Sequence, residues 1–121
     1  MNSVPLKFGR AKGIAIGWFS KHGYIVSTPL VRHMDYDLLV DNGKIQRVRV
    51  VSTSCKNKSG HWEATLATSA DGVSNRKFSK RSCDLVFIAC DYSEFYVIPT
   101  RQIKNTYKVV PTKNPTWRVN W

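Results

Sequence analysis

Acidic residues are scarce in this 121-residue chain and are missing altogether from its two ends. Eight Asp and Glu residues stand against 19 Lys and Arg residues, so the formal net charge is +11. Residues 1–34 and residues 95–121 hold five basic residues each and no acid. Such an imbalance favours a polyanionic partner over a basic surface that only aids solubility. We therefore expect binding to DNA, with RNA as the alternative.

The chain also lacks long apolar runs and paired cysteines. No apolar run approaches the length that a membrane helix needs, and the N-terminus has no signal-peptide pattern, so we expect a cytoplasmic protein without a membrane partner. The three cysteines, Cys55, Cys83 and Cys90, form no CxxC pair, which predicts reduced and mostly packed thiols. The histidines fit no metal-binding spacing either.

The residues that are present suit one folded domain over residues 1–121. A hydrophobic fraction of 42% and four tryptophans favour a packed core over disorder. The chain contains no internal repeat, no low-complexity tract and no linker that would divide it.

The N-terminal part of the chain predicts one helix. Residues 1–9 contain a proline that restricts a helix to its first turn, so we expect an extended arm there. Residues 10–22 predict a helix in which Ala11 and Ala15 form a shallow face that a sheet can approach. Gly23 is expected to end this helix, because a positive φ is easy only for glycine.

A β-hairpin gives the strongest local signal. Residues 38–40 form a short apolar strand, residues 41–44 a turn, and residues 45–54 an alternating return strand. The Asn42-Gly43 pair predicts a type I′ turn, in which both central residues have φ > 0. Further strands are expected at residues 25–28, 61–68, 83–90 and 95–99, with an edge strand near residues 117–121. The continuously apolar run at residues 83–90 predicts a central, buried strand.

These segments resemble a known family. Tyr-Asp-Leu-Leu-Val at residues 36–40, the turn, and Arg-Val-Arg-Val-Val-Ser-Thr at residues 47–53 resemble the core of the PD-(D/E)XK nuclease superfamily, and look closest to the small homing endonucleases encoded in group I introns. The resemblance covers roughly residues 10–100 and leaves residues 101–121 as a basic C-terminal extension. It implies a restriction-endonuclease-like α/β fold, with a mixed, mostly antiparallel central sheet of about five or six strands and the N-terminal helix packed on it.

The resemblance also implies a catalytic site that this chain does not complete. In the family, an Asp on the first hairpin strand and an acid or Gln on the second hold a divalent metal, and a Lys two residues later assists the reaction. Here Asp37 keeps the first position, whereas Arg49 and Val51 occupy the other two. Arginine has no acceptor for a metal, and valine has no polar atom. The family's additional Glu on the first helix is missing from residues 14–17. We expect no cofactor, and Mg²⁺ on Asp37 if the protein is active.

Two alternatives stay open at this site. The simpler one is a salt bridge in which Arg49 takes the place of the metal and lowers the pKa of Asp37. In the other, a lysine and a second acid have moved into the missing roles. The candidates are Lys12, Lys44 and Lys56 for the lysine, and Asp35 and Glu63 for the acid.

Two basic loops are the candidates for contact with nucleic acid. Lysines and arginines in such loops bind phosphates in a sequence-independent manner, and an aromatic side chain between them can stack on a base. The predicted nucleic-acid-binding residues are Lys12, Lys56, Asn57, Lys58, Arg76, Lys77, Phe78, Lys80 and Arg81.

The chain is therefore expected to be a nucleic-acid-binding, catalytically inactive relative of homing endonucleases, acting in a bacterial or phage-infected cell. The resemblance adds a homo-oligomer as an expectation. The first alternative is a Mg²⁺-dependent DNA endonuclease with a rewired active site. The second is a protein-binding module of phage or mobile-element origin, which would use exposed aromatic residues such as Trp117 and Trp121.

Overall fold

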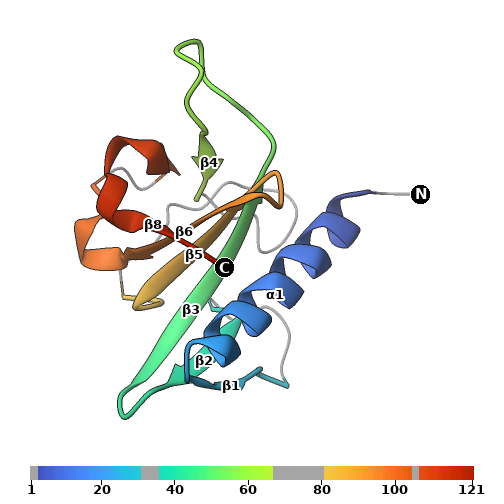
Figure 1. Cartoon of the computed structure of the whole chain (residues 1–121), viewed down its shortest axis with the longest axis vertical. Helices are drawn as coiled ribbons and strands as arrows, with labels where there is room; N and C mark the ends of the chain where they lie inside the picture. The colour runs from blue at the N-terminus through green and yellow to red at the C-terminus, as the bar shows by residue number, and fades with distance from the viewer. Residues whose placement is uncertain (1–2, 31–35, 67–80, 105–106) are drawn as a thin grey trace.

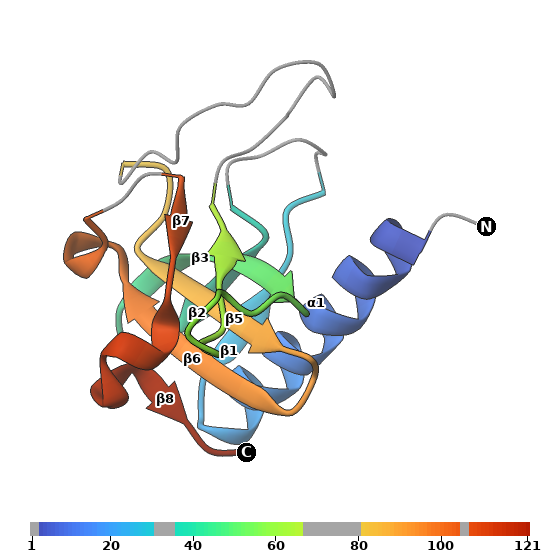
Figure 2. The same cartoon turned by 90° about the horizontal axis from the view of Figure 1, so that it is seen from above.

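Helix α1 (Ser3–Lys21) lies across one face of a six-stranded sheet in the computed structural model, which describes residues 3–30, 36–66, 81–104 and 107–121 (Figure 1). The sheet contains, in spatial order, β1 (Ile25–Ser27), β2 (Leu38–Asp41), β3 (Ile45–Thr53), β5 (Leu85–Cys90), β6 (Glu94–Pro99) and β8 (Arg118–Val119). The other face carries a two-stranded sheet and short 3-10 turns (Figure 2). These elements are β4 (Ala64–Thr65), β7 (Lys108–Val109), η1 (Thr100–Gln102), η2 (Pro111–Lys113) and η3 (Pro115–Trp117).

Neighbouring strands of the large sheet pair antiparallel except for β3 and β5, which are parallel. The expected mixed, mostly antiparallel sheet with an N-terminal helix packed on it is therefore confirmed. The predicted central strand is β5, whose six residues are all buried between β3 and β6. Its continuous apolar character follows from burial on both faces.

Two apolar clusters form the core, one on each face of the sheet. The cluster under α1 contains Ala11, Ala15, Trp18, Phe19, Leu38, Val40, Val48, Val50, Leu85, Phe87 and Ala89. The cluster on the opposite face contains Val51, Ala64, Leu66, Cys83, Val86, Ile88, Cys90, Tyr96, Ile98 and Ile103. Strand β3 supplies residues to both clusters because successive side chains point to opposite faces of a strand.

The helix begins earlier than the sequence suggested. It starts at Ser3, so the expected extended arm over residues 1–9 is wrong. Pro5 lies in the first turn, where a backbone N–H has no helical acceptor and its absence costs no hydrogen bond. Ala11 and Ala15 are fully buried against the sheet, as their small size predicted. Within the described part of the chain, no helix is long and apolar enough to cross a membrane.

The end of the helix has the geometry that Gly23 predicted. Gly23 has a φ of +88°, and its N–H donates to the Ser20 carbonyl at 3.2 Å. The N–H of Tyr24 donates to the Phe19 carbonyl at 3.0 Å. These two bonds form a Schellman motif, which satisfies carbonyl groups that the helix leaves without partners.

The β2–β3 hairpin is also confirmed, but its turn differs from the predicted type. Asp41 pairs with Ile45, so the loop has three residues and not two. Gly43 has a φ of +110°, whereas Asn42 has no positive φ, which excludes a type I′ turn. The N–H of Gly43 donates to Oδ1 of Asp41 at 2.9 Å, so a side chain closes the turn.

The C-terminal residues pack against α1. Strand β8 pairs with the edge of β6, which confirms the edge strand expected there. The indole N–H of Trp18 donates to the Asn120 carbonyl at 2.8 Å. Gly17 lies directly under the ring of Trp121, where a Cβ atom would approach Cη2 of the ring to 3.0 Å. A glycine inside α1 therefore allows the last residue of the chain to pack on the helix.

Replacing two helical glycines tests this contact. Gly13→Ala should stabilise the protein by about 1 kcal/mol, because alanine favours a helix and a Cβ atom at Gly13 meets nothing within 4 Å. Gly17→Ala should give clearly less, because Trp121 must move to make room. Urea unfolding of both variants measures the difference. Equal stabilisation would show that Trp121 does not pack on the helix in solution.

Candidate functional site

Asp37 lies at the start of β2, directly beside β3. Its N–H donates to the Val48 carbonyl at 2.8 Å, and its Oδ2 accepts from the Val50 N–H at 2.7 Å. Leu38 pairs with Val48, so Asp37 is level with Arg49 on the neighbouring strand. The hairpin thus brings together the residues that the sequence placed at the motif positions, and a backbone hydrogen bond orients the carboxylate.

The net shift of the Asp37 pKa differs from the expectation. Burial raises the pKa of Asp37 above its ordinary value of 3.8, and this effect outweighs the hydrogen bond from Val50 and the charges of Arg49 and Lys12, which all lower it. The expected lowering effect of the Arg49 charge is therefore present, but the net shift of this pKa is upward. The positive charge of Arg49 lies close to Asp37, but the removal of the carboxylate from water has the larger effect on its pKa.

Val51 belongs to the core and not to an open site. Its side chain is only 8% exposed and packs in the apolar cluster opposite α1. The position that the resemblance assigns to the family's lysine is therefore filled by a methyl-bearing side chain among apolar neighbours. A water-activating amine has no counterpart at this place.

The other candidate acids and lysines are scattered. Glu63 forms an ion pair with Lys108 at 3.5 Å, and Asp35 lies outside the described residues. Lys12, on the half-buried side of α1, is close enough for its charge to act on Asp37. In the part of the chain that the structure describes, no three His, Cys, Asp or Glu side chains come together as a set that could hold a metal ion.

Two of the three thiols are buried, in agreement with the sequence prediction of mostly packed cysteines. Burial raises the pKa of Cys83 to about 11 and that of Cys90 to about 12, so both stay protonated at neutral pH. Cys55 is exposed.

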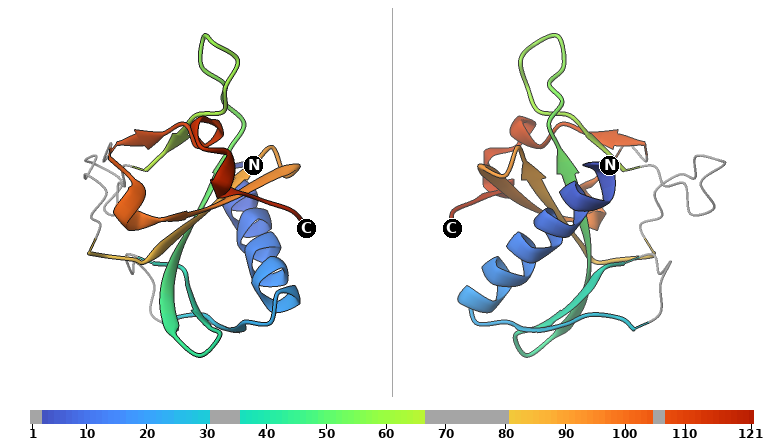
Figure 3. Two further views of the ribbon diagram at one scale, coloured as in Figure 1. Left: turned by 60° about the vertical axis from the view of Figure 1, so that its left-hand side comes forward. Right: turned by 90° about the vertical axis from the view of Figure 1, so that its right-hand side faces the viewer.

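The predicted basic loops are described only in part. Arg76, Lys77, Phe78 and Lys80 lie outside the described residues, whereas Arg81 is exposed just before β5. Lys56, Asn57 and Lys58 lie in residues 54–63, which we call the β3–β4 finger. This segment projects from the body of the molecule beyond the end of β3 (Figure 3).

No local sequence pattern indicated the residues that support this finger. The indole N–H of Trp62 donates to Oε2 of Glu94 at 3.1 Å, and the hydroxyl of Tyr96 donates to the same oxygen at 3.0 Å. Burial, followed by the hydrogen bond to Glu94, raises the pKa of Tyr96 to about 12, so this hydroxyl remains a donor. Trp62 and Glu94 are 32 residues apart, and no local pattern connects them.

The comparison with known families decides the relationship. The sequence model of the PD-(D/E)XK endonuclease family matches residues 9–118. The chain belongs to this family. The match extends beyond the expected core at residues 10–100 and includes most of the segment that was expected to be an extension.

Solved structures of two proteins share the fold. A bacterial homing endonuclease, I-Ssp6803I, superposes with a TM-score of 0.75 at 24% sequence identity, over 89% of this chain and 77% of its own. Hjc, a Holliday junction resolvase from the archaeal hyperthermophile Archaeoglobus fulgidus, superposes with a TM-score of 0.59 at 12% identity, over 93% of this chain and 90% of its own. No curated protein matches the chain. The restriction-endonuclease-like fold is thereby confirmed.

The divalent metal that the family implies does not fit the residues present at the motif positions. Asp37 offers a carboxylate that is already hydrogen-bonded to Val50, with the guanidinium of Arg49 on the adjacent strand. Mg²⁺ needs carboxylates and water in an octahedral arrangement, and arginine repels it. The residues at these positions therefore do not support a metal-dependent step.

A pair of aspartate variants tests the electrostatics. The pKa of Asp37 is raised, so its charge disfavours the folded state increasingly as pH rises above the ordinary value of 3.8. Asp37→Asn should therefore be at least as stable as the wild type at pH 7, with the difference shrinking as pH falls toward 3.8.

Asp84 is the matched control. The backbone N–H of Arg47 donates to it at 2.8 Å and lowers its pKa, so its contribution to stability is present above its ordinary pKa of 3.8 and is lost as pH falls through the lowered value. Asp84→Asn should therefore destabilise the protein at pH 7. Urea unfolding at several pH values measures both variants, and effects of the same sign would contradict the assignment.

Proposed function

We propose that this protein binds duplex DNA without cutting it. One observation carries the proposal: Asp37 stands beside Arg49 and a buried Val51, where a metal-dependent nuclease of the family needs a second ligand and a lysine. An always-charged guanidinium cannot replace a metal ligand, and an aliphatic side chain cannot activate water.

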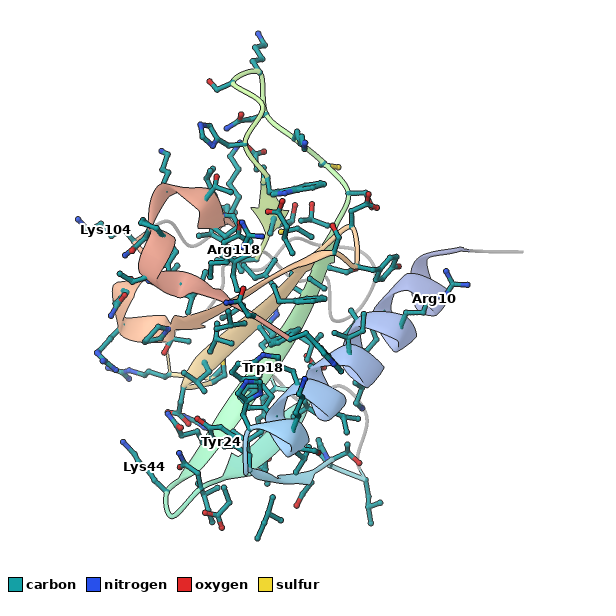
Figure 4. The ribbon with its side chains drawn as sticks, in the orientation of Figure 1. Arg10, Trp18, Tyr24, Lys44, Lys104 and Arg118 are labelled. Carbon is teal, nitrogen blue, oxygen red and sulfur yellow. The ribbon has the colours of Figure 1, made fainter. Side chains whose placement is uncertain are left out.

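The charge distribution supports retained binding. The excess of positive charge is spread over several elements, since exposed basic side chains occur in α1, in the finger and in the C-terminal part of the chain. Arg10, Lys104 and Arg118 mark this spread (Figure 4). Each phosphate that such a side chain neutralises releases counterions, which gives affinity without sequence recognition.

A rewired nuclease is the second candidate, and one observation favours it. The charge of Lys12 acts on Asp37 from α1, so an amine is available near the carboxylate although Val51 cannot supply one. Within the part of the chain that the structure describes, no second acid joins Asp37 in a metal-binding set. Lys12→Ala would abolish cleavage if Lys12 had taken the missing role.

The protein-binding alternative has less support. Trp117 is half-buried and its indole N–H donates to Gln102 at 2.6 Å, while Trp121 packs over Gly17. Trp117 thus has a structural role, whereas Trp121 packs on α1 with one face and is still 51% exposed.

A combined assay tests the proposed function. Plasmid and a labelled duplex are incubated with the wild type in Mg²⁺, in Mn²⁺ and in EDTA, with Asp37→Ala and Lys12→Ala alongside. We expect a mobility shift in every condition and no cleavage product, because the described residues bring no three His, Cys, Asp or Glu side chains together as a metal site. The shift should weaken steeply with added salt.

The outcomes separate the candidates. Cleavage in Mg²⁺ that stops in Asp37→Ala and Lys12→Ala would overturn the proposal in favour of a rewired nuclease. A protein that neither binds nor cuts would refute the proposed binding of duplex DNA and leave the protein-binding alternative.

A further inference from the structure

The β3–β4 finger is a preformed two-stranded ribbon. The N–H of Asn57 donates to the His61 carbonyl at 2.8 Å, and the N–H of Glu63 donates to the Cys55 carbonyl at 3.0 Å. Lys56 and Trp62 form an antiparallel bridge between these bonds. The backbone of the finger is therefore paired along its length and does not depend on a partner for its shape.

The tip of the finger is closed by its own side chain. Oδ1 of Asn57 accepts from the N–H groups of Ser59 at 2.9 Å and of His61 at 3.1 Å. Gly60 supplies the φ of +80° that the turn requires. Asn57, which the sequence suggested as a nucleic-acid ligand, thus uses its amide oxygen to shape the tip.

The base of the finger is fixed to the body of the protein. Trp62 is held by Glu94, and Nζ of Lys56 lies 4.6 Å from the centre of the Trp62 ring, in cation–π geometry. Nδ1 of His61 lies 2.9 Å from Oγ1 of Thr112, which orients the imidazole. A ribbon held in this way loses little entropy on binding, so its contacts contribute more of their energy to affinity.

The exposed side chains of the finger match the edges of a DNA duplex. Lys56, Lys58, Ser59 and His61 are exposed, and all carry hydrogen-bonding groups. The major groove of B-DNA is about 12 Å wide and admits a two-stranded β-ribbon. A lysine can donate to O6 and N7 of guanine there, and serine can bond to several bases.

We propose that the β3–β4 finger enters the major groove of duplex DNA and contacts base edges through Lys58, Ser59 and His61. This inference rests on the proposed binding of duplex DNA and adds which element gives it specificity. Lys56, held over Trp62, lies nearer the base of the finger, where the phosphate backbone flanks an inserted ribbon.

The position of the finger agrees with this role. It continues β3 directly beyond Thr53, on the strand that also carries Arg49 and Val51. The other end of β3 carries the β2–β3 loop with Lys44, a distance of about 30 Å for a nine-residue strand. Figure 4 shows Lys44 at the end of the molecule opposite the finger. These two exposed lysines, each in a glycine-containing loop, form a matched pair.

The first experiment reverses the charge at each lysine. Lys58→Glu and Lys44→Glu change the net charge equally, and both sites are exposed, so circular dichroism should show both variants folded. A duplex pool enriched with the wild type from a random library serves as the probe, in fluorescence anisotropy titrations at several salt concentrations. Lys58→Glu should weaken binding by about tenfold or more, whereas Lys44→Glu should change it far less.

Two further readouts distinguish groove contact from phosphate contact. Methylation of guanine N7 in the enriched duplex should reduce binding by the wild type, because N7 faces the major groove. A photo-crosslinker attached to Cys55, the exposed thiol of the three, should form adducts with the duplex. The single strand of the same sequence should compete poorly.

The results separate this inference from the function on which it rests. If the wild type binds no duplex, the proposed function itself fails. If it binds but Lys58→Glu and Lys44→Glu weaken binding equally, or if N7 methylation has no effect, DNA binding stands and the major-groove assignment is overturned. Binding of the single strand as tightly as the duplex also overturns it.

Discussion

The parallel pairing of β3 with β5 is the constraint on which the rest of the structure depends. Six consecutive residue pairs hold β3 in a single register. Because side chains alternate across a strand, this register directs Val48 and Val50 toward α1 and directs Arg49 and Val51 to the opposite face. A slip of one residue would put an arginine under the helix. The packing of the core and the composition of the site beside Asp37 are therefore set by the same pairing.

Burial determines whether the pKa of each aspartate that is hydrogen-bonded to β3 is raised or lowered. Asp37 and Asp84 each accept a hydrogen bond from a backbone N–H of this strand, at 2.7 Å and 2.8 Å. The more exposed Asp84 gains from its bond and from Arg47, so its pKa falls, whereas desolvation of Asp37 exceeds similar gains and its pKa rises. A carboxylate that is costly to ionise does not stabilise the fold at neutral pH. The hydrogen bond from Val50 therefore orients the Asp37 carboxylate toward β3 without making its charge favourable.

The parts of the fold that were predictable depend on local chemistry. The buried strand β5 and the helix end at Gly23 follow from residues within a few positions of each other, as does the β2–β3 hairpin. The turn types were not predictable from the local sequence. Two consecutive positive φ values were expected near Asn42, but they occur at Asp91 and Tyr92, with φ of 51° and 58°, in the β5–β6 connection. Neither residue type alone predicts a positive φ here, so the pairing of β5 with β6 imposes this backbone conformation. The support of the finger by Glu94 was hidden for the same reason, since it joins distant segments.

The finger and the site beside Asp37 are held in place by largely different contacts. The finger is held by its own backbone bonds, by Trp62 on Glu94 and by His61 on Thr112. None of these contacts involves Asp37, although the hydroxyl of Thr53 at the end of β3 also donates to the Glu63 carbonyl at 2.6 Å. An arginine and a valine at the motif positions thus leave the ribbon in place, and Val51 even adds to the core beneath it. If the proposed function holds, substitutions at the motif positions can remove the chemistry of the family while the finger keeps its shape.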